Sequence, residues 1–118
     1  MTNYMIVYNA TESAGETMAK STKEEMQASM AAWMAWKDEA EKKVKFEFGS
    51  PMQAVGRITP DGVVASDSQA SGYSMIEADS KELVIEVLRN HPHLQRKGAT
   101  IDVLEMITMP GMSHTAPM

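Results

Sequence analysis

The sequence predicts an α+β domain, and three observations lead to that class. Short runs typical of strands are separated by two longer runs with helical periodicity. A Thr-Pro-Asp-Gly turn between two branched runs predicts a β-hairpin. The elements follow in the order β-α-β, hairpin, β-α-β. This order predicts a ferredoxin-like βαββαβ sandwich with an extra β-hairpin and both helices on one face of an antiparallel sheet.

The N-terminal half predicts a strand, a long helix and a second strand. Residues 3–8 are aromatic and branched and predict the opening strand, whereas residues 9–20 are small and polar and predict a loop. Positions 21–24 hold Ser and Glu at the spacing of a capping box, and residues 22–43 are strong helix formers without Gly or Pro. Residues 44–48 alternate with a period of two, which predicts the second strand.

The C-terminal half predicts the hairpin, a strand, a shorter helix and a last strand. Residues 55–65 contain the two hairpin strands, and residues 72–78 predict the third main strand. Asp79-Ser80 is expected to cap the second helix, which ends at the His-Pro-His sequence because the residue before a proline avoids the helical conformation. Residues 100–109 predict the last strand.

Composition bounds the class of protein. A chain of 118 residues makes one domain, which we place at residues 1–109, with a C-terminal tail at 110–118. A net charge of −5 argues against nucleic acid and anionic membranes as partners, since a basic surface supplies most of that affinity. The N-terminus lacks the features of a signal peptide, so we expect a cytoplasmic protein. Cysteine and the Gly-rich nucleotide motifs are absent from the sequence, and no cofactor is predicted.

Twelve methionines are an unusual feature of this sequence. Met26, Met30 and Trp33 have helical spacing, so we expect them on the buried face of the long helix. A thioether copper site around Met106 and Met109 is the alternative use of methionine. The core interpretation is preferred because several methionines lie inside periodic segments.

Both faces of the predicted sheet are apolar. In the first strand, Tyr4 and Ile6 face one side while Met5 and Val7 face the other. A sheet covered on one face alone alternates between apolar and polar residues. Because two helices cover only one face, we predict a homodimer in which the sheet faces of two copies pack together.

Three segments resemble the YCII-related family: Gly72–Ser80 (Gly-Tyr-Ser-Met-Ile-Glu-Ala-Asp-Ser), the His-Pro-His-Leu turn at 91–94, and Ile-Asp-Val-Leu-Glu at 101–105. Members of that family look like small proteins of the dimeric α+β barrel superfamily, and the resemblance spans roughly residues 3–109. Some members have a His–Asp pair suspected of catalysis, but this chain has no histidine among its first 90 residues. Many members also carry an Asp-Gly-Pro-Phe motif, of which only Asp67 has a counterpart here.

His91 and His93 are the strongest candidates for chemistry. As catalytic groups they would act as a general base lining a pocket, with Asp67 as a third candidate catalytic residue. In the structural alternative, His91 caps the helix end and His93 is buried with a hydrogen bond to the backbone. The two-residue spacing does not match a helical metal site, so no metal site is predicted. His114 lies in the tail.

Tyr73 and Glu105 are the candidate ligand-binding residues. Tyr73 lies in a strand and could present its hydroxyl to a cavity, although interface tyrosines often do so without chemistry. Glu105 shares its face of the last strand with apolar residues, and a desolvated carboxylate there would suit a general acid or base. The alternative for Glu105 is an ion pair with Arg57, Arg89 or Lys45.

The sequence therefore predicts a small homodimeric protein with a pocket for an unidentified small molecule. If the protein is an enzyme, we expect cofactor-free acid–base chemistry. The alternatives are a non-catalytic ligand-binding or structural dimer, and a cofactor-free oxygenase, which rests on fold analogy alone.

Overall fold

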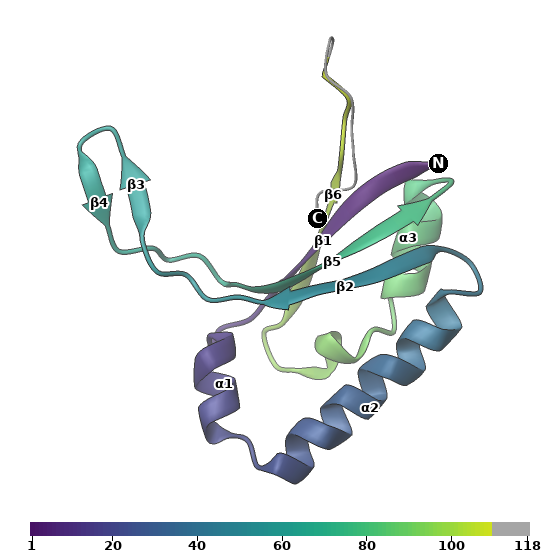
Figure 1. The fold of residues 1–118 in the computed structure, drawn as a ribbon, viewed down its shortest axis with the longest axis horizontal. Coiled ribbons are helices and arrows are strands. Elements are labelled where there is room, and N and C mark those ends of the chain that lie inside the picture. Colours follow the sequence, from purple (N-terminus) through teal and green to yellow (C-terminus); the bar gives the residue numbers. More distant parts are fainter. Residues whose placement is uncertain (110–118) are drawn as a thin grey trace.

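Six strands, three α-helices and a short 3-10 helix make up residues 1–109, the part of the chain that this computed structural model describes (Figure 1). The predicted tail, with His114, lies outside the described residues. In chain order the elements are β1 (Thr2–Asn9), α1 (Ala14–Lys20), α2 (Lys23–Ala40), β2 (Lys45–Pro51), β3 (Arg57–Thr59), β4 (Gly62–Val64), β5 (Ala70–Ala78), α3 (Lys81–Leu88), η1 (Pro92–Gln95) and β6 (Thr100–Glu105).

Four strands form one antiparallel sheet in the order β2-β5-β1-β6. Counted as the four main strands, this order is 2-3-1-4, which agrees with a ferredoxin-like sandwich. The α+β class is therefore confirmed. The predicted hairpin is also confirmed, because β3 and β4 pair with each other in a separate two-stranded sheet.

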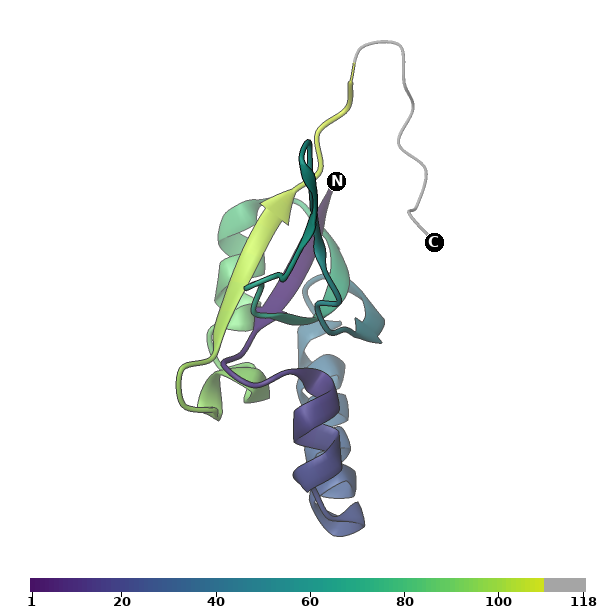
Figure 2. The same ribbon diagram turned by 90° about the vertical axis from the view of Figure 1, so that its left-hand side faces the viewer.

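The core lies between the sheet and the two longer helices, α2 and α3. Alternate residues of β1 point into it, and its buried side chains come from β1, α2, β2, β5 and α3 and the turn before β2. These side chains are Tyr4, Ile6, Tyr8, Trp36, Ala40, Val44, Phe46, Ile76, Ala78, Val84, Val87 and Leu88. Figure 2 shows α3 beside the sheet, with α1 and part of α2 extending below it.

No helix of residues 1–109 covers the opposite face of the sheet. Met5 of β1 pairs with Met75 of β5 and with Leu104 of β6, so the three side chains lie in one row across the sheet. Val7 follows two residues after Met5 on the same side. We call Met5, Val7, Met75 and Leu104 the open face; Leu104 is 49% exposed within it.

A helix stands where the sequence analysis predicted a loop. Residues 14–20 form α1, which begins at a capping box: the Ser13 hydroxyl accepts from the Glu16 amide and the Glu16 carboxylate accepts from the Ser13 amide. The prediction of a loop over 9–20 was wrong because small polar residues were given more weight than this capping pattern.

The cap of α2 also differs from the predicted one. Thr22 and Glu25 form the capping box, one residue later than the predicted pair Ser21 and Glu24. Ser21 instead ends α1, where its hydroxyl donates to the Thr17 carbonyl at 2.7 Å. The helix ends at Ala40 rather than at residue 43.

The predicted buried face of α2 is only partly correct. Trp36 and Ala40 are buried and Trp33 packs against the core, whereas Met26 and Met30 are 45% and 62% exposed. The first half of α2 extends beyond the sheet, so no strand lies beneath these methionines (Figures 1 and 2). Helical periodicity predicts an apolar face, but it does not say how far the covering sheet extends.

The last strand is shorter than predicted. β6 ends at Glu105 instead of residue 109. Glu105 pairs with Tyr4, and the Met106 amide donates to the Asn3 carbonyl at 2.9 Å. Beyond that point β1 has only two more residues with which an edge strand could pair, so the ladder stops.

Candidate functional site

The His-Pro-His turn joins α3 to the last strand and is built by its own side chains. His91 is the N-cap of η1, and its Nδ1 accepts a hydrogen bond from the His93 amide at 3.0 Å. Pro92 follows as the first residue of η1, where its missing N–H costs nothing. Because Nδ1 acts as an acceptor, the single hydrogen of the neutral His91 ring lies on Nε2.

His91 is enclosed by aromatic rings. Only 1% of it is exposed, and its ring centroid lies 4.4 Å from that of Trp33, 4.3 Å from Trp36 and 5.0 Å from Tyr8. We call these four residues the aromatic cluster. Burial, aided by the nearby His93, lowers the pKa of His91 to about 3. Its Nε2–H is a buried donor without a hydrogen-bond partner among the described residues, and a second proton could bind only at Nδ1, which already accepts from the His93 amide.

The polar atoms of Tyr8 and Trp36 are satisfied within the protein. The Tyr8 hydroxyl donates to the Ser74 hydroxyl at 2.9 Å, and burial raises the pKa of Tyr8 to about 12. The Trp36 indole N–H donates to the Val87 carbonyl at 2.9 Å. The cluster therefore joins α2, β1, β5 and α3 at one end of the core.

His93 fastens η1 to the end of β1. It is 4% exposed, and its Nε2 lies 2.8 Å from the Asn9 carbonyl, to which it donates. Burial lowers the pKa of His93, while hydrogen bonds with the backbone of Asn9 and Thr100 act in the opposite direction. The structural alternative is thus confirmed for His93, which is buried against backbone, and wrong for His91, whose side chain caps the start of η1 rather than the end of α3.

The other three predicted site residues lie elsewhere. Asp67 is exposed and pairs with Arg57, which lowers the pKa of its carboxyl. Tyr73 lies across Gly49 of the neighbouring strand, so closely that a β-carbon at Gly49 would overlap the Tyr73 ring. Glu105 is exposed at the end of β6, opposite Tyr4 and far from the turn.

Two of the three cations proposed as partners of Glu105 have other contacts. Arg57 pairs with Asp67, and Lys45 lies 3.6 Å from Glu77. Of the five candidate site residues, the structure brings together His91 and His93. Asp67 lines a different hollow, of about 310 Å³, at the start of α1, with Ser13 and Ala70 among its other walls.

A second hollow lies beside the His-Pro-His turn, and we call it the α2–η1 cleft. Its volume is about 440 Å³, within the usual range for small-molecule sites. The α2 wall contains Trp33 and Ser29, and the η1 wall contains His93, Gln95 and Arg96. The remaining lining residues are Ala28, Ala32 and Pro92.

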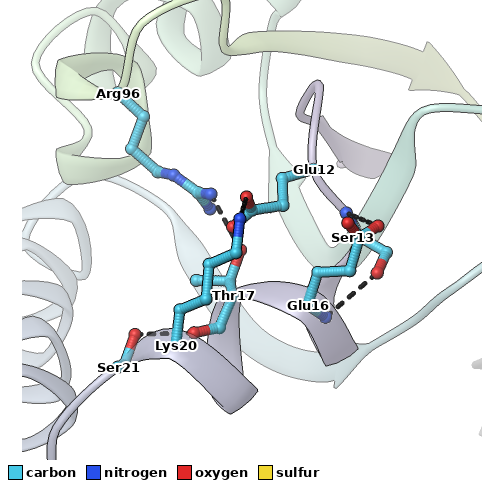
Figure 3. Close-up of polar contacts among 7 residues, drawn as sticks. All are labelled: Glu12, Ser13, Glu16, Thr17, Lys20, Ser21 and Arg96. Carbon is cyan, nitrogen blue, oxygen red and sulfur yellow. Dashed lines mark hydrogen bonds and ion pairs between the residues drawn. The ribbon is translucent and has the colours of Figure 1, made fainter.

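Arg96 is held at this cleft by contacts with α1 (Figure 3). Its Nη2 donates to the Thr17 hydroxyl at 3.0 Å, and that hydroxyl donates to the Glu12 carboxylate at 3.1 Å. Lys20 binds the second Glu12 oxygen at 2.6 Å, and this hydrogen bond is the main reason why the pKa of Glu12 is lowered. The guanidinium is thus hydrogen-bonded to a neutral hydroxyl, while its charge also acts on the Glu12 carboxylate and helps to lower the pKa of Glu12.

The sequence analysis predicted His93 in a pocket but missed three other lining residues. Ser29, Gln95 and Arg96 were given no role there, although all three line the cleft. Trp33 was assigned to the core. Its ring does contact the buried Tyr8 and His91, but it also lines the cleft. The available signal was the charge of the turn that follows the two histidines.

Comparison with protein-family models gives no match, and no curated protein matches the chain. Within residues 1–109, no group of three or more His, Asp or Glu side chains is placed to hold a metal ion. Of the helices in the same range, none is both long and apolar enough to cross a membrane.

Proposed function

We propose that this chain binds a small anionic molecule with a flat apolar body in the α2–η1 cleft. The supporting observation is the lining of that cleft: an indole, a guanidinium, an amide and a hydroxyl, with no carboxylate, in a chain of net charge −5. The ligand's flat part would contact Trp33, and its carboxylate would pair with Arg96. Gln95 and Ser29 offer further hydrogen bonds.

We further propose that this binding protein does not use the His-Pro-His turn as a general base. A base needs a free lone pair within reach of the substrate. In His91 the lone-pair nitrogen already accepts from the His93 amide, and the ring is closed off from solvent. In His93, Nε2 donates to the Asn9 carbonyl, and the ring also has a hydrogen bond with the Thr100 backbone. These contacts support structural roles for both rings.

The test uses benzoate as a flat anion and benzamide as its neutral isostere. Titrated into isotope-labelled protein, benzoate should shift the NMR signals of the Trp33 indole and of Gln95 and Arg96, with benzamide at least tenfold weaker. Arg96→Gln should abolish the preference for benzoate. Lys97→Gln removes the neighbouring cation, which does not line the cleft, and should preserve it. Equal binding of both probes, or shifts confined to another surface, would contradict the proposal.

Acid–base catalysis by His93 is the second candidate function. One observation favours it: His93 lines the cleft, and its lowered pKa keeps it neutral at pH 7, the state that a base requires. If His93 meets the ligand, saturating benzoate should raise the His93 pKa in an NMR titration, because an anion stabilises the charged ring. An unchanged His93 pKa with benzoate bound would contradict a catalytic role for His93 and leave the binding proposal intact.

We also propose that the chain is a YCII-like, cytoplasmic homodimer that forms a dimeric α+β barrel through the open face. The support is the ferredoxin-like strand order and the apolar row Met5, Met75 and Leu104 on the side without helices. Light scattering during size exclusion should give twice 13.0 kDa. A mass of one chain at all concentrations would contradict the dimer and leave the cleft proposal intact.

A further inference from the structure

We propose that the β3–β4 hairpin of one copy packs on the open face of a second copy of this chain. We call residues 55–65 the arm. The inference deepens the homodimer proposed above, and rests on it, because it names the segment that covers the open face. In this dimer, each copy places its arm on the other, and the two arms add to the contact between the two sheets.

The arm carries the most exposed large apolar side chains among the described residues. Val55 is 93% exposed, Ile58 85% and Val63 74%, while Val64 is 49% exposed. Ile58 and Val63 pair directly across the hairpin, so they form one apolar surface. Exposed apolar patches on a formed element mark interaction sites more often than chance, and this one lies at the end of a projection.

The arm is a formed hairpin rather than an irregular loop. Gly62 adopts a φ of +137°, which other residues rarely adopt, and closes the turn after Asp61. The Thr59 hydroxyl accepts from the Asp61 amide at 3.2 Å and donates to the Gly62 carbonyl at 3.1 Å. Near its base, Arg57 pairs with Asp67. Hydrogen bonds within the arm thus hold its turn.

A two-stranded hairpin with no third layer is marginally stable in water. Neither β3 nor β4 pairs with a strand of the main sheet, and the exposure of Ile58 shows that the arm does not pack on its own body. Figure 1 shows the arm projecting away from the sheet, on the side opposite α3. Residues 1–109 of its own chain therefore leave the arm uncovered, and we infer that a second chain covers it.

The open face of a second copy is a surface that fits the arm. The row Met5, Met75 and Leu104 at its centre is apolar, with Glu47 and Asp102 on the same side of the sheet. No helix of residues 1–109 covers it, and it belongs to the same sequence, so each copy offers both an arm and a site. Two-fold symmetry then places each arm on the other copy and closes the assembly at two chains. A partner of different sequence would leave each chain's own open face without this cover.

The reach of the arm matches the size of the open face. The six steps from Pro51, which ends β2, to Arg57 span at most about 20 Å in an extended chain. Four strands spaced by about 4.8 Å make a sheet about 14 Å wide. The arm is therefore long enough to cross the sheet of a facing copy.

The first experiment measures the dimer dissociation constant of the full chain by light scattering over a dilution series. Ile58→Asp places a charge on the exposed arm, where the single chain tolerates it, and should raise the dissociation constant tenfold or more. Ile85→Asp is the matched control: Ile85 is 42% exposed on α3, in the helix layer, and its replacement should leave the constant unchanged.

The second experiment locates the arm. The chain contains no cysteine, so Asp61→Cys can carry a single spin label at the arm's turn. Mixed with isotope-labelled wild-type protein, it should broaden the amide signals of β1 and β6 around Met5 and Leu104 in the other copy. A wild-type monomer would overturn both the homodimer and the arm exchange. A dimer that is unaffected by Ile58→Asp, or broadening only at the partner's arm, would overturn the exchange alone.

Discussion

The packed body and the projecting part of this chain contain the same kinds of apolar residue in opposite environments. In the body, Ile6 and Val84 are fully buried between the sheet and its helices. In the projecting part, which comprises α1, the first half of α2 and the arm, Ile58 is 85% and Met30 62% exposed. The difference is whether a sheet lies beneath the side chain. An apolar side chain therefore indicates a surface that can be buried, but whether it is buried depends on which elements of the fold pack against it.

The projecting part is held by polar contacts instead of packing. No residue of α1 is buried, and both α1 and α2 begin at capping boxes. Thr17 links Glu12 to Arg96 and so connects α1 to η1 (Figure 3). Such contacts fix the orientation of α1 relative to η1 without burying apolar side chains, which stay available to a partner.

The largest expected contrast compares two isoleucines, one from each part. Ile6→Ala removes buried methylenes from the core and should lower the free energy of unfolding by about 2–5 kcal/mol. Ile58→Ala should change it by less than about 0.5 kcal/mol when measured by chemical denaturation at concentrations where the chain is monomeric. If both variants cost the same, the arm packs on its own body and the comparison fails.

The next effect is the pH dependence of folding stability that His91, in the packed body, contributes. The folded state holds the His91 pKa at about 3, against about 6.5 in the unfolded chain, so below pH 6.5 the unfolded chain binds more protons. His91 thus contributes stability that is complete above pH 6.5 and is lost as the pH falls towards 3. The loss should reach about 1.4 kcal/mol per pH unit, measured by denaturation between pH 6.5 and 5.

His91→Asn isolates this effect. Asparagine keeps a side-chain acceptor for the His93 amide but does not titrate. The variant should be less stable at pH 7.5, because the cluster loses a ring, and its stability should fall less steeply between pH 6.5 and 5. The window above pH 5 avoids Glu12 and Asp67, whose carboxyls have lowered pKa values. An unchanged slope would mean that the His91 ring takes up protons in the folded state.

Much of the fold could be predicted because it depends on local patterns. Alternation placed the main strands, and the Thr-Pro-Asp-Gly turn placed the hairpin. The errors arise where local signals compete or where length matters. The Ser13–Glu16 capping box was passed over in a polar segment, and Met30 was expected to be buried because periodicity cannot show where the sheet ends.

The candidate site was less predictable because its parts are distant in sequence. The His-Pro-His turn could be selected from composition alone. The contacts that define its role join His91 to Tyr8 and Trp36, and His93 to Asn9. The separation of 84 residues between His93 and Asn9 carries no local signal. Such contacts follow from strand order and register, which bring the end of β1 beside η1.

The smallest expected effect compares the helix caps of the two parts. Ser80 accepts from the Leu83 amide at the start of α3, whose Val84 and Leu88 are buried, so Ser80→Ala should lower the global stability by about 0.5–2 kcal/mol. Thr22→Ala removes the equivalent bond from α2, but the turns that follow it are exposed. Its cost should therefore be local fraying: faster amide exchange in the first turns of α2, with a global change below that of Ser80→Ala. If Thr22→Ala instead accelerates exchange in β1 and β5 as well, the projecting half of α2 unfolds together with the body, and the two parts are one cooperative unit.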